Sequence, residues 1–307
     1  MTHTHENHPP HNRPGHGPAP EGDSVLPELL DLDAALGAPV LAAARGAADT
    51  ALHAPPRSIV DLGAGTGTGT FALAAHYPDA RIHSLDASLQ MLERLSATAA
   101  AAGVADRVET HLVDLDGDWP QVVPRGVDLA WAALSLHHVT DPDQVLRQVF
   151  DVLRPGGVLI VTEFTDVTTY EPDDLGTGRD GLGHRVVSAL AARGYPVTAE
   201  WTTALTAAGF APVERTAAAL TASADTANGA RYLELHLSRN RDFLSEDLNG
   251  EDLAALDTAI AALKAGTSNL QCASGRAFWA AVRPASTPAQ DAIEQEQEQD
   301  EIRRHEI

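Results

Sequence analysis

The sequence predicts an α/β fold with a doubly wound, mainly parallel sheet. Three observations lead to this class: short apolar segments alternate with segments of helical spacing between residues 57 and 164, several apolar segments end in an acid, and a glycine-rich turn follows the first one at residues 63–67. Strands that alternate with helices favour a parallel sheet, whose ligands bind outside the C-terminal strand ends. The acids and glycines therefore mark the edge at which a ligand is expected.

The first predicted strand and its turn read IVDLGAGTGTGT over residues 59–70. Gly63, Gly65 and Gly67 permit a tight turn that approaches a ligand without Cβ atoms, and the N–H groups at the start of the next helix point towards it. The spacing fails the dinucleotide fingerprint G-x-G-x-x-G in both registers, because threonine occupies the last position. A P-loop is excluded because the only lysine is Lys264.

What remains, D-x-G-x-G-x-G after a strand, resembles the first motif of the class I S-adenosylmethionine-dependent methyltransferases. The match comprises Asp61, Gly63, Gly65 and Gly67. The later segments L-H-H-V and L-R-P-G-G plus an apolar strand look like those of the ubiquinone/menaquinone-type small-molecule methyltransferases. The resemblance implies S-adenosyl-L-methionine as cofactor, held at its methionine end by the glycine turn. It also implies a Rossmann-like sheet of seven strands that ends in an antiparallel hairpin.

The second and third predicted strands, residues 81–86 and 108–114, each end in an acid. Asp86 is the candidate for the two ribose hydroxyls, since nucleoside-binding sheets place an acid there; alternatively it caps the following helix. Asp114 stands in the family position for the adenine amine, and Met91 either covers the adenine or belongs to the core. The resemblance thus places these residues at the cofactor: Asp61, Gly63, Ala64, Gly65, Thr66, Gly67, Asp86, Ala87, Met91, Asp114, Leu115 and Ala132.

The fourth predicted strand, residues 127–133, runs into His137 and His138. A sulfonium methyl is already activated, so the protein must chiefly align the acceptor with the S–CH₃ bond and exclude water. Adjacent residues leave a strand in different directions, and we favour His137 as an assisting base. Alternatively, His137 only hydrogen-bonds the backbone and shapes the pocket. Glu163 and His184 are further candidates, and no metal is required.

Composition excludes several function classes. The chain has 307 residues, a formal net charge of −22 and a single cysteine, Cys272. An acidic surface disfavours nucleic acid and anionic lipid, and no apolar run approaches the roughly 18–20 residues that span a bilayer. The N-terminus lacks a signal-peptide pattern, and one cysteine cannot form an intrachain disulfide, so the cytoplasm is expected. The expected partner is a small, partly apolar metabolite, not a nucleic acid or a membrane.

One methyltransferase domain is predicted over residues 24–285, between two disordered tails. Residues 1–23 are rich in His and Pro, and residues 286–307 are acidic and rich in Gln. The lid and substrate wall are expected at 165–200 and 221–270, because insertions on the active face of such folds carry specificity. The remaining expectations are a helical region at 24–53, a mobile connection at 165–195, a helix at 201–209, a strand at 210–219, helices at 226–245 and 250–265, and a strand at 276–282.

Two other functions are compatible with parts of the pattern. A Rossmann-like oxidoreductase would also use an acid such as Asp86 for a ribose, but the broken glycine spacing argues against it. A catalytically silent cofactor-binding protein would keep every motif, because only turnover separates binding from catalysis.

Overall fold

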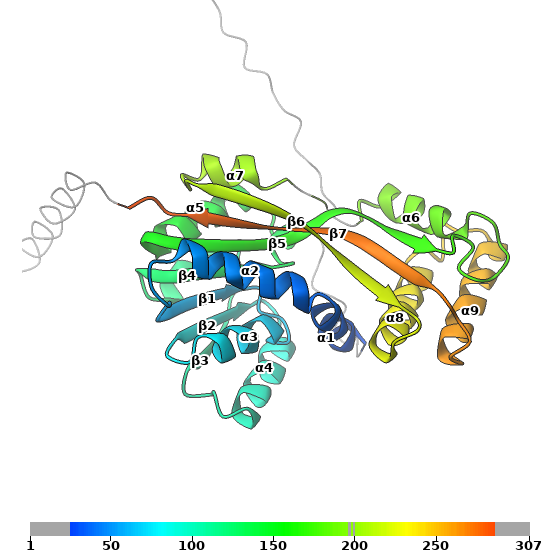
Figure 1. Ribbon diagram of the computed structural model, residues 1–307, viewed down its shortest axis with the longest axis horizontal. Coiled ribbons are helices and arrows are strands. Elements are labelled where there is room, and N and C mark those ends of the chain that lie inside the picture. The colour runs from blue at the N-terminus through cyan, green and yellow to red at the C-terminus, as the bar shows by residue number, and fades with distance from the viewer. Residues whose placement is uncertain (1–24, 196–197, 199, 286–307) are drawn as a thin grey trace, which may run out of the picture.

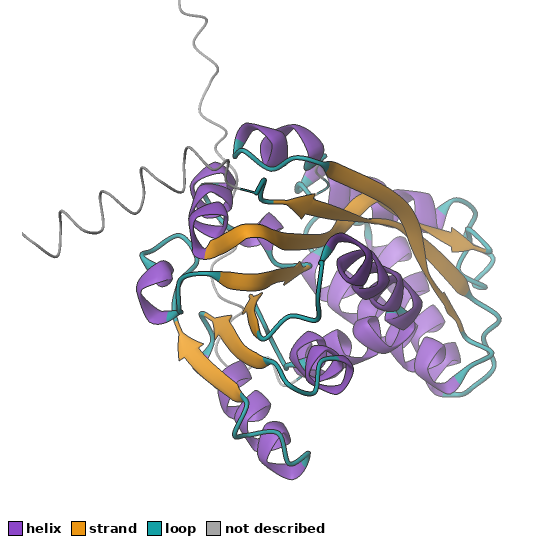
Figure 2. Ribbon diagram, turned by 60° about the vertical axis from the view of Figure 1, so that its left-hand side comes forward, coloured by secondary structure: helices purple, strands orange, loops and turns teal. Residues whose placement is uncertain are grey.

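The computed structural model describes residues 25–195, 198 and 200–285, and it contains a seven-stranded sheet with helices on both faces (Figures 1 and 2). The strand order is β3-β2-β1-β4-β5-β7-β6, in which β1 to β5 are parallel and β7 runs antiparallel between β5 and β6. This confirms the predicted class. The strands are β1 Ser58–Leu62, β2 Arg81–Asp86, β3 Val108–Leu112, β4 Val127–Ala133, β5 Leu153–Glu171, β6 Val213–Ser223 and β7 Gln271–Val282.

Two apolar layers enclose the parallel part of the sheet. One face packs against α2 (Ala38–Ala51) and α3 (Thr68–His76), and α4 (Leu89–Ala101) covers β2 and β3. The other face packs against α5 (Pro142–Val152) and α7 (Thr202–Ala207). Because both faces are covered, β1 and β4 are almost continuously apolar and buried, as is usual for parallel strands.

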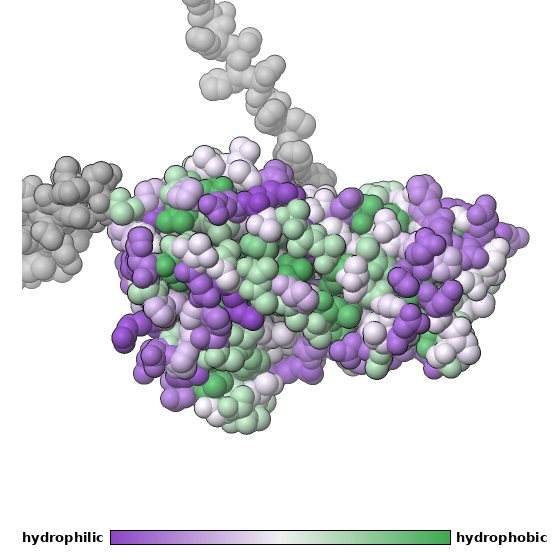
Figure 3. All heavy atoms as spheres, in the orientation of Figure 1, coloured by the Kyte–Doolittle hydropathy of each residue, from purple (hydrophilic) through white to green (hydrophobic). Residues whose placement is uncertain are grey.

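The three strands β5, β7 and β6 continue beyond the parallel sheet and carry a second core. Their distal ends pack against α6 (Leu182–Ala192), α8 (Ala227–Phe243) and α9 (Gly250–Lys264), which lie together at one end of the molecule in Figure 1. We call these strand ends and helices the helical module. On the face shown in Figure 3, apolar side chains gather mostly between the two ends of the molecule, and hydrophilic ones are prominent at both ends.

The structure corrects the predicted mobile connection at 165–195. β5 instead continues to Glu171, because Thr168 to Glu171 pair with Ser274 to Gln271 of β7, and α6 follows. The sequence of residues 165–195 does not indicate the core of the helical module, because the apolar residues there are widely spaced among polar ones. The predicted pair of helices between the last strands is present as α8 and α9. Several aromatic and aliphatic side chains in and beside the segments expected as lid and substrate wall are buried: Tyr170, Trp201, Tyr232, Leu235 and Leu237.

Helix α1 (Leu26–Leu36) contacts both the parallel part of the molecule and the helical module. Glu28 pairs with Arg231 of α8 at 2.7 Å, Asp31 pairs with Arg94 of α4, and Asp33 pairs with Arg276 of β7 at 3.0 Å. The predicted helical region at 24–53 is therefore two helices, α1 and α2, and the first crosses between the two cores.

The predicted tails, residues 1–23 and 286–307, lie outside the described residues. Among the residues that the structure describes, no helix combines the length and the apolar character needed to cross a bilayer.

Candidate active site

The glycine turn after β1 is fixed against the neighbouring strand. Gly63, Gly65 and Gly67 have φ angles of 72°, 54° and 89°, in the left-handed region that favours glycine. The backbone N–H groups of Gly63 and Ala64 both donate to the carbonyl of Leu85 in β2, at 2.9 and 2.8 Å. The turn therefore has one defined position at the C-terminal edge of the sheet.

A side chain would have a different consequence at each of the three glycines. A Cβ atom at Gly63 would lie 2.4 Å from Cβ of Ser135, and one at Gly67 would lie 2.6 Å from Cγ of Leu95, so both glycines permit close packing of the protein itself. A Cβ atom at Gly65 would meet nothing within 4 Å. Gly65 therefore faces open space, as a cofactor cradle requires, and the sequence pattern alone does not distinguish it from its neighbours.

Asp86 holds the turn to the start of α4. Its Oδ2 accepts the N–H of Gly65 and its Oδ1 accepts the N–H of Ser88, both at 2.8 Å. The helix cap itself is Ser88, whose hydroxyl accepts the N–H of Met91. A carboxylate offers about four acceptor sites, so the Asp86 side chain can also accept a ribose hydroxyl. Burial raises the pKa of the Asp86 carboxyl.

Asp61 is buried below the turn, with a side chain that accepts the Thr70 hydroxyl at 2.6 Å. Thr70 also lies 2.9 Å from the Ser84 hydroxyl, so the acid is part of a buried polar group under the helix start. Burial raises the pKa of Asp61 to about 7, with a smaller contribution from the nearby negative charge of Asp86 and against the lowering effect of the Thr70 hydrogen bond. Sequence reasoning did not identify Thr70 or Ser84.

The other predicted cofactor residues are placed at different depths. Asp114 is exposed after β3, and its Oδ1 accepts the N–H of Asp116, which in turn accepts the N–H groups of Thr140 and Asp141. The loops after β3 and β4 are thus tied together. Ala87 is exposed at the β2 end, whereas these residues are buried: Ala64, Thr66, Met91, Leu115 and Ala132. The side chain of Ala132 packs within the core on the α5 face.

His137 and Glu163, which the sequence offers as separate candidates, form a pair. His137 Nδ1 lies 2.7 Å from Glu163 Oε2, and the backbone N–H of His137 donates to Oε1 at 3.3 Å. The side chains are 10% and 1% exposed. The neighbour His138 is exposed, and His184 lies on the exposed side of α6 in the helical module. His137 and Glu163 therefore form one hydrogen-bonded pair, whereas His184 lies in the helical module and does not belong to it.

The chain reaches this pair through a strained residue. Leu134, directly after β4, has a φ angle of 56°, and its N–H donates to Thr162 of β5 at 2.8 Å. A bulky residue with positive φ is an outlier that persists only where its surroundings fix it, and such residues cluster at functional sites. This turn directs Ser135 against Gly63 and His137 against Glu163. No local sequence signal indicates it.

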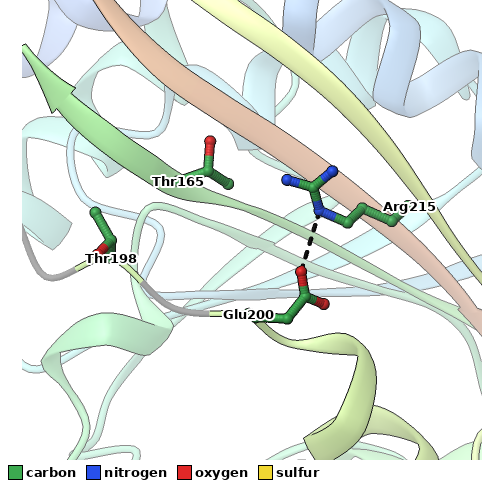
Figure 4. A pocket seen from close by; sticks show the side chains of 4 residues that line it. All are labelled: Thr165, Thr198, Glu200 and Arg215. Atoms are coloured by element: carbon green, nitrogen blue, oxygen red, sulfur yellow. Dashed lines mark ion pairs between the residues drawn. The ribbon is translucent and has the colours of Figure 1, made fainter.

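A shallow pocket lies further along β5 from Glu163. Thr165, Thr198, Glu200 and Arg215 line it (Figure 4). Arg215 Nε and Glu200 Oε2 lie 3.2 Å apart, and the guanidinium also packs over Trp279. Both charges of the pocket are therefore already paired with each other.

Comparison with known proteins independently supports a methyltransferase domain in this chain. A family model described as "Methyltransferase domain" matches residues 60–159. The malonyl-[acyl-carrier protein] O-methyltransferase of Laribacter hongkongensis is 32% identical over 139 residues, covering 44% of this chain and 46% of that protein. The trans-aconitate 2-methyltransferase of Methylobacterium radiotolerans is 34% identical over 139 residues, with 45% of each covered. The chain thus matches less than half the length of these curated relatives.

Among solved structures, the geranyl diphosphate C-methyltransferase of Streptomyces coelicolor aligns with a TM-score of 0.50 at 15% identity, covering 86% of each chain. A protein assigned as a methyltransferase from Bacillus halodurans aligns with a TM-score of 0.52 at 16% identity, covering 80% of this chain and 99% of that one. At this identity the likeness concerns the fold. The matched family model identifies a methyltransferase domain over residues 60–159, in agreement with the resemblance of the glycine turn to the class I S-adenosylmethionine-dependent methyltransferases.

Proposed function

We propose that this protein transfers a methyl group from S-adenosyl-L-methionine to a small, partly apolar metabolite. The observation that carries the proposal is the position of the Gly65 cradle and of the His137–Glu163 pair at the same edge of the parallel sheet: Gly65 follows β1, His137 follows β4, and Glu163 lies within β5. In such sheets the C-terminal strand ends form the ligand crevice. A cofactor cradle beside a histidine whose orientation is fixed suits transfer with proton removal.

The cofactor supplies a methyl group that is already activated on a positively charged sulfur. Gly65 leaves room for its approach, and the oxygens of Asp86 are available to hydroxyl donors. Asp86 places negative charge beside the turn, which favours a cationic ligand over an anionic one. The bond that breaks is S–CH₃ and the bond that forms joins the methyl carbon to the acceptor.

His137 is suited to receive the proton that the acceptor loses. When Nδ1–H donates to Glu163, the lone pair of Nε2 is free to accept a proton. Glu163 then acts as a positioning residue, because it fixes the tautomer and the ring and stabilises the charged imidazole. Phe164 contacts the His137 ring edge-on, with ring centroids 5.4 Å apart, and limits its rotation.

The acceptor class rests on charge and on the surroundings of the site. A formal net charge of −22 opposes binding of polyanions or anionic membranes, so nucleic acid and membrane are not proposed as partners. The relatives are named for substrates as different as malonyl-[acyl-carrier protein], trans-aconitate and 27-O-demethylrifamycin SV. The segments proposed as substrate wall are residues 165–200 and 221–270. Buried, unpaired Cys272 agrees with a reducing compartment, and we propose the cytoplasm.

Two measurements test the proposal in sequence. Calorimetry with S-adenosylhomocysteine tests the cradle, and Asp86→Ala is expected to weaken binding by about 1–3 kcal/mol, the usual effect of losing a charged hydrogen-bond partner. Asp114→Ala serves as the matched acid and is expected to cost less, because its proposed contact is a single amine. No heat with the wild-type protein would refute the cofactor assignment.

Turnover is tested with labelled S-adenosylmethionine and extracts separated into small-molecule, protein and nucleic acid fractions. Label in the small-molecule fraction supports the proposal. Label confined to protein or nucleic acid contradicts the acceptor class, and binding without transfer to any fraction identifies a silent cofactor-binding protein.

A further inference from the structure

Three potential metal ligands meet on the edge of the sheet, away from the methyl-transfer site. His83 of β2 is in register with Glu109 of the edge strand β3, and His111 follows two residues later on β3. Side chains two residues apart on a strand point to the same face. Thr110, between the two β3 residues, contacts Ser96 of α4 at 3.4 Å. The three ligands therefore share the face of the edge strand opposite α4.

The donor atoms are spaced as a metal would need them. His83 Nδ1 and His111 Nε2 lie 3.2 Å apart, and oxygens of Glu109 lie 3.5 Å from the first and 3.8 Å from the second. A tetrahedral zinc ion with bonds of about 2.0–2.1 Å separates its ligands by roughly 3.3–3.4 Å. The two nitrogens are thus close to the spacing of two zinc ligands, and one ligand atom from each of the three residues lies within 4.8 Å of the others. Because the two short Glu109 distances involve different oxygens, the exposed carboxylate must turn to bring one oxygen to the ion.

We propose that His83, Glu109 and His111 form a binding site for a divalent transition metal, with zinc as the best match. Two imidazoles with one carboxylate are a borderline-soft donor set, which favours zinc or its neighbours over magnesium or calcium. Both histidine side chains are 12% exposed, whereas Glu109 is 67% exposed. The site is therefore fixed on its imidazole side and open on its carboxylate side, where an ion can enter and keep water as its fourth ligand.

The site is independent of the proposed methyl transfer. His83 lies in the interior of β2, three residues before Asp86, and its partners lie on an edge strand, whereas the glycine turn follows β1. A bound ion would connect β2 to β3 through side chains and would stabilise the folded state, since it binds that state only. An exposed edge strand is where such a connection is most effective, because β3 has a neighbour on one side only.

The test is zinc binding by calorimetry to the full chain after treatment with a chelator. The wild-type protein is compared with His111→Gln and with His76→Gln, a matched control in which the substituted histidine instead pairs with Asp49 at 2.8 Å. The tail histidines remain in all three proteins, so their zinc binding cancels: His3, His5, His8, His11 and His16. We expect His111→Gln to lose one equivalent of bound zinc, and His76→Gln to lose none.

Thermal unfolding distinguishes this site from surface binding. Zinc is expected to raise the Tm of the wild-type protein and of His76→Gln, and to leave the Tm of His111→Gln unchanged. Glu109→Gln, at an exposed position, keeps the fold and is expected to weaken the site at least tenfold. Equal zinc stoichiometry and affinity in wild type, His111→Gln and Glu109→Gln would overturn the proposal, as would a wild-type Tm that zinc does not change.

Discussion

The parallel half of the sheet and the helical module stabilise their polar groups in different ways. In the parallel half, the acids near the C-terminal ends of β1 and β2 make few side-chain contacts: Asp86 contacts backbone N–H groups, and Asp61 contacts Thr70. In the helical module, a carboxylate that is 1% exposed, Asp252, binds two arginines at once. The first arrangement leaves acids available to a ligand, whereas the second uses its charges internally.

Because of this difference, we expect the acids of the parallel half to affect ligand binding and Asp252 of the helical module to affect the stability of the fold. Arg179 and Arg185 contact Asp252 at 2.8 and 2.9 Å, and Asn249 contacts the same carboxylate at 2.9 Å, so all of its lone pairs are directed within the module. The pKa of Asp252 is lowered by these contacts, whereas the pKa of Asp61 is raised by burial. Variants in the two halves should therefore change different observables.

The largest expected effect concerns the His137–Glu163 pair. His137→Gln should lower kcat by roughly 10²–10⁴-fold, the usual contribution of a positioned base, with cofactor affinity unchanged. Glu163→Gln should lower kcat by a smaller factor, because the amide oxygen can still accept the Nδ1–H and orient the ring. His53→Gln, at an exposed position after α2, is the control and should retain activity. An active His137→Gln variant would leave only a structural role for the pair.

Gly65→Val tests whether Gly65 is required for ligand binding, whereas Gly63 is required for packing within the protein. It should weaken S-adenosylhomocysteine binding by roughly a hundredfold, equivalent to about 2.7 kcal/mol. Gly103→Val is matched for backbone strain, since its φ is 69° and a Cβ atom there also meets nothing within 4 Å. Equal affinities of the two variants, measured by calorimetry, would show that strain and not the cradle is responsible. Gly63→Ala should instead lower Tm, because its Cβ would overlap Ser135.

The raised pKa of Asp61 predicts a specific pH dependence of stability. A carboxyl whose folded-state pKa is about 7 favours folding while it is protonated, and that contribution is lost as the pH rises towards 7. Asp61→Asn keeps an oxygen for the Thr70 hydroxyl and does not ionise. Between about pH 5 and about pH 8, the free energy of unfolding of the wild type should fall relative to Asp61→Asn by on the order of 2–3 kcal/mol. Urea titrations at both pH values measure this, and parallel pH profiles would contradict it.

The smallest of these effects is expected in the helical module. Asp252→Asn removes the charge that two arginines share and should lower the free energy of unfolding by about 2 kcal/mol, without changing cofactor affinity. Asp257→Asn is the control, because its pair with Arg241 is exposed on both sides and should contribute less than about 1 kcal/mol. A loss of cofactor affinity in Asp252→Asn would show that the two halves are coupled, through α1 as the element that contacts both.

The parallel half was predictable because its signals are local. A strand, a glycine turn and a helix start are adjacent in the chain, and an acid at a strand end is placed by the strand itself, so Asp61, Gly65 and Asp86 were identified together with the sheet that carries them. The same reasoning was less effective for residues 165–171, which extend β5 only because β7 pairs with most of them.

The sequence by itself determined the α/β class, the succession of strands and helices, and the edge at which the glycine turn and the acids lie, because periodicity and turn stereochemistry depend on neighbouring residues. Only the tertiary structure joined Glu163 to His137, directed Gly65 to open space and Gly63 to Ser135, and gathered His83, Glu109 and His111 on one face. These relations depend on which strands are adjacent and on their register. Side chains from separate strands meet only once backbone pairing over long sequence separations has fixed both.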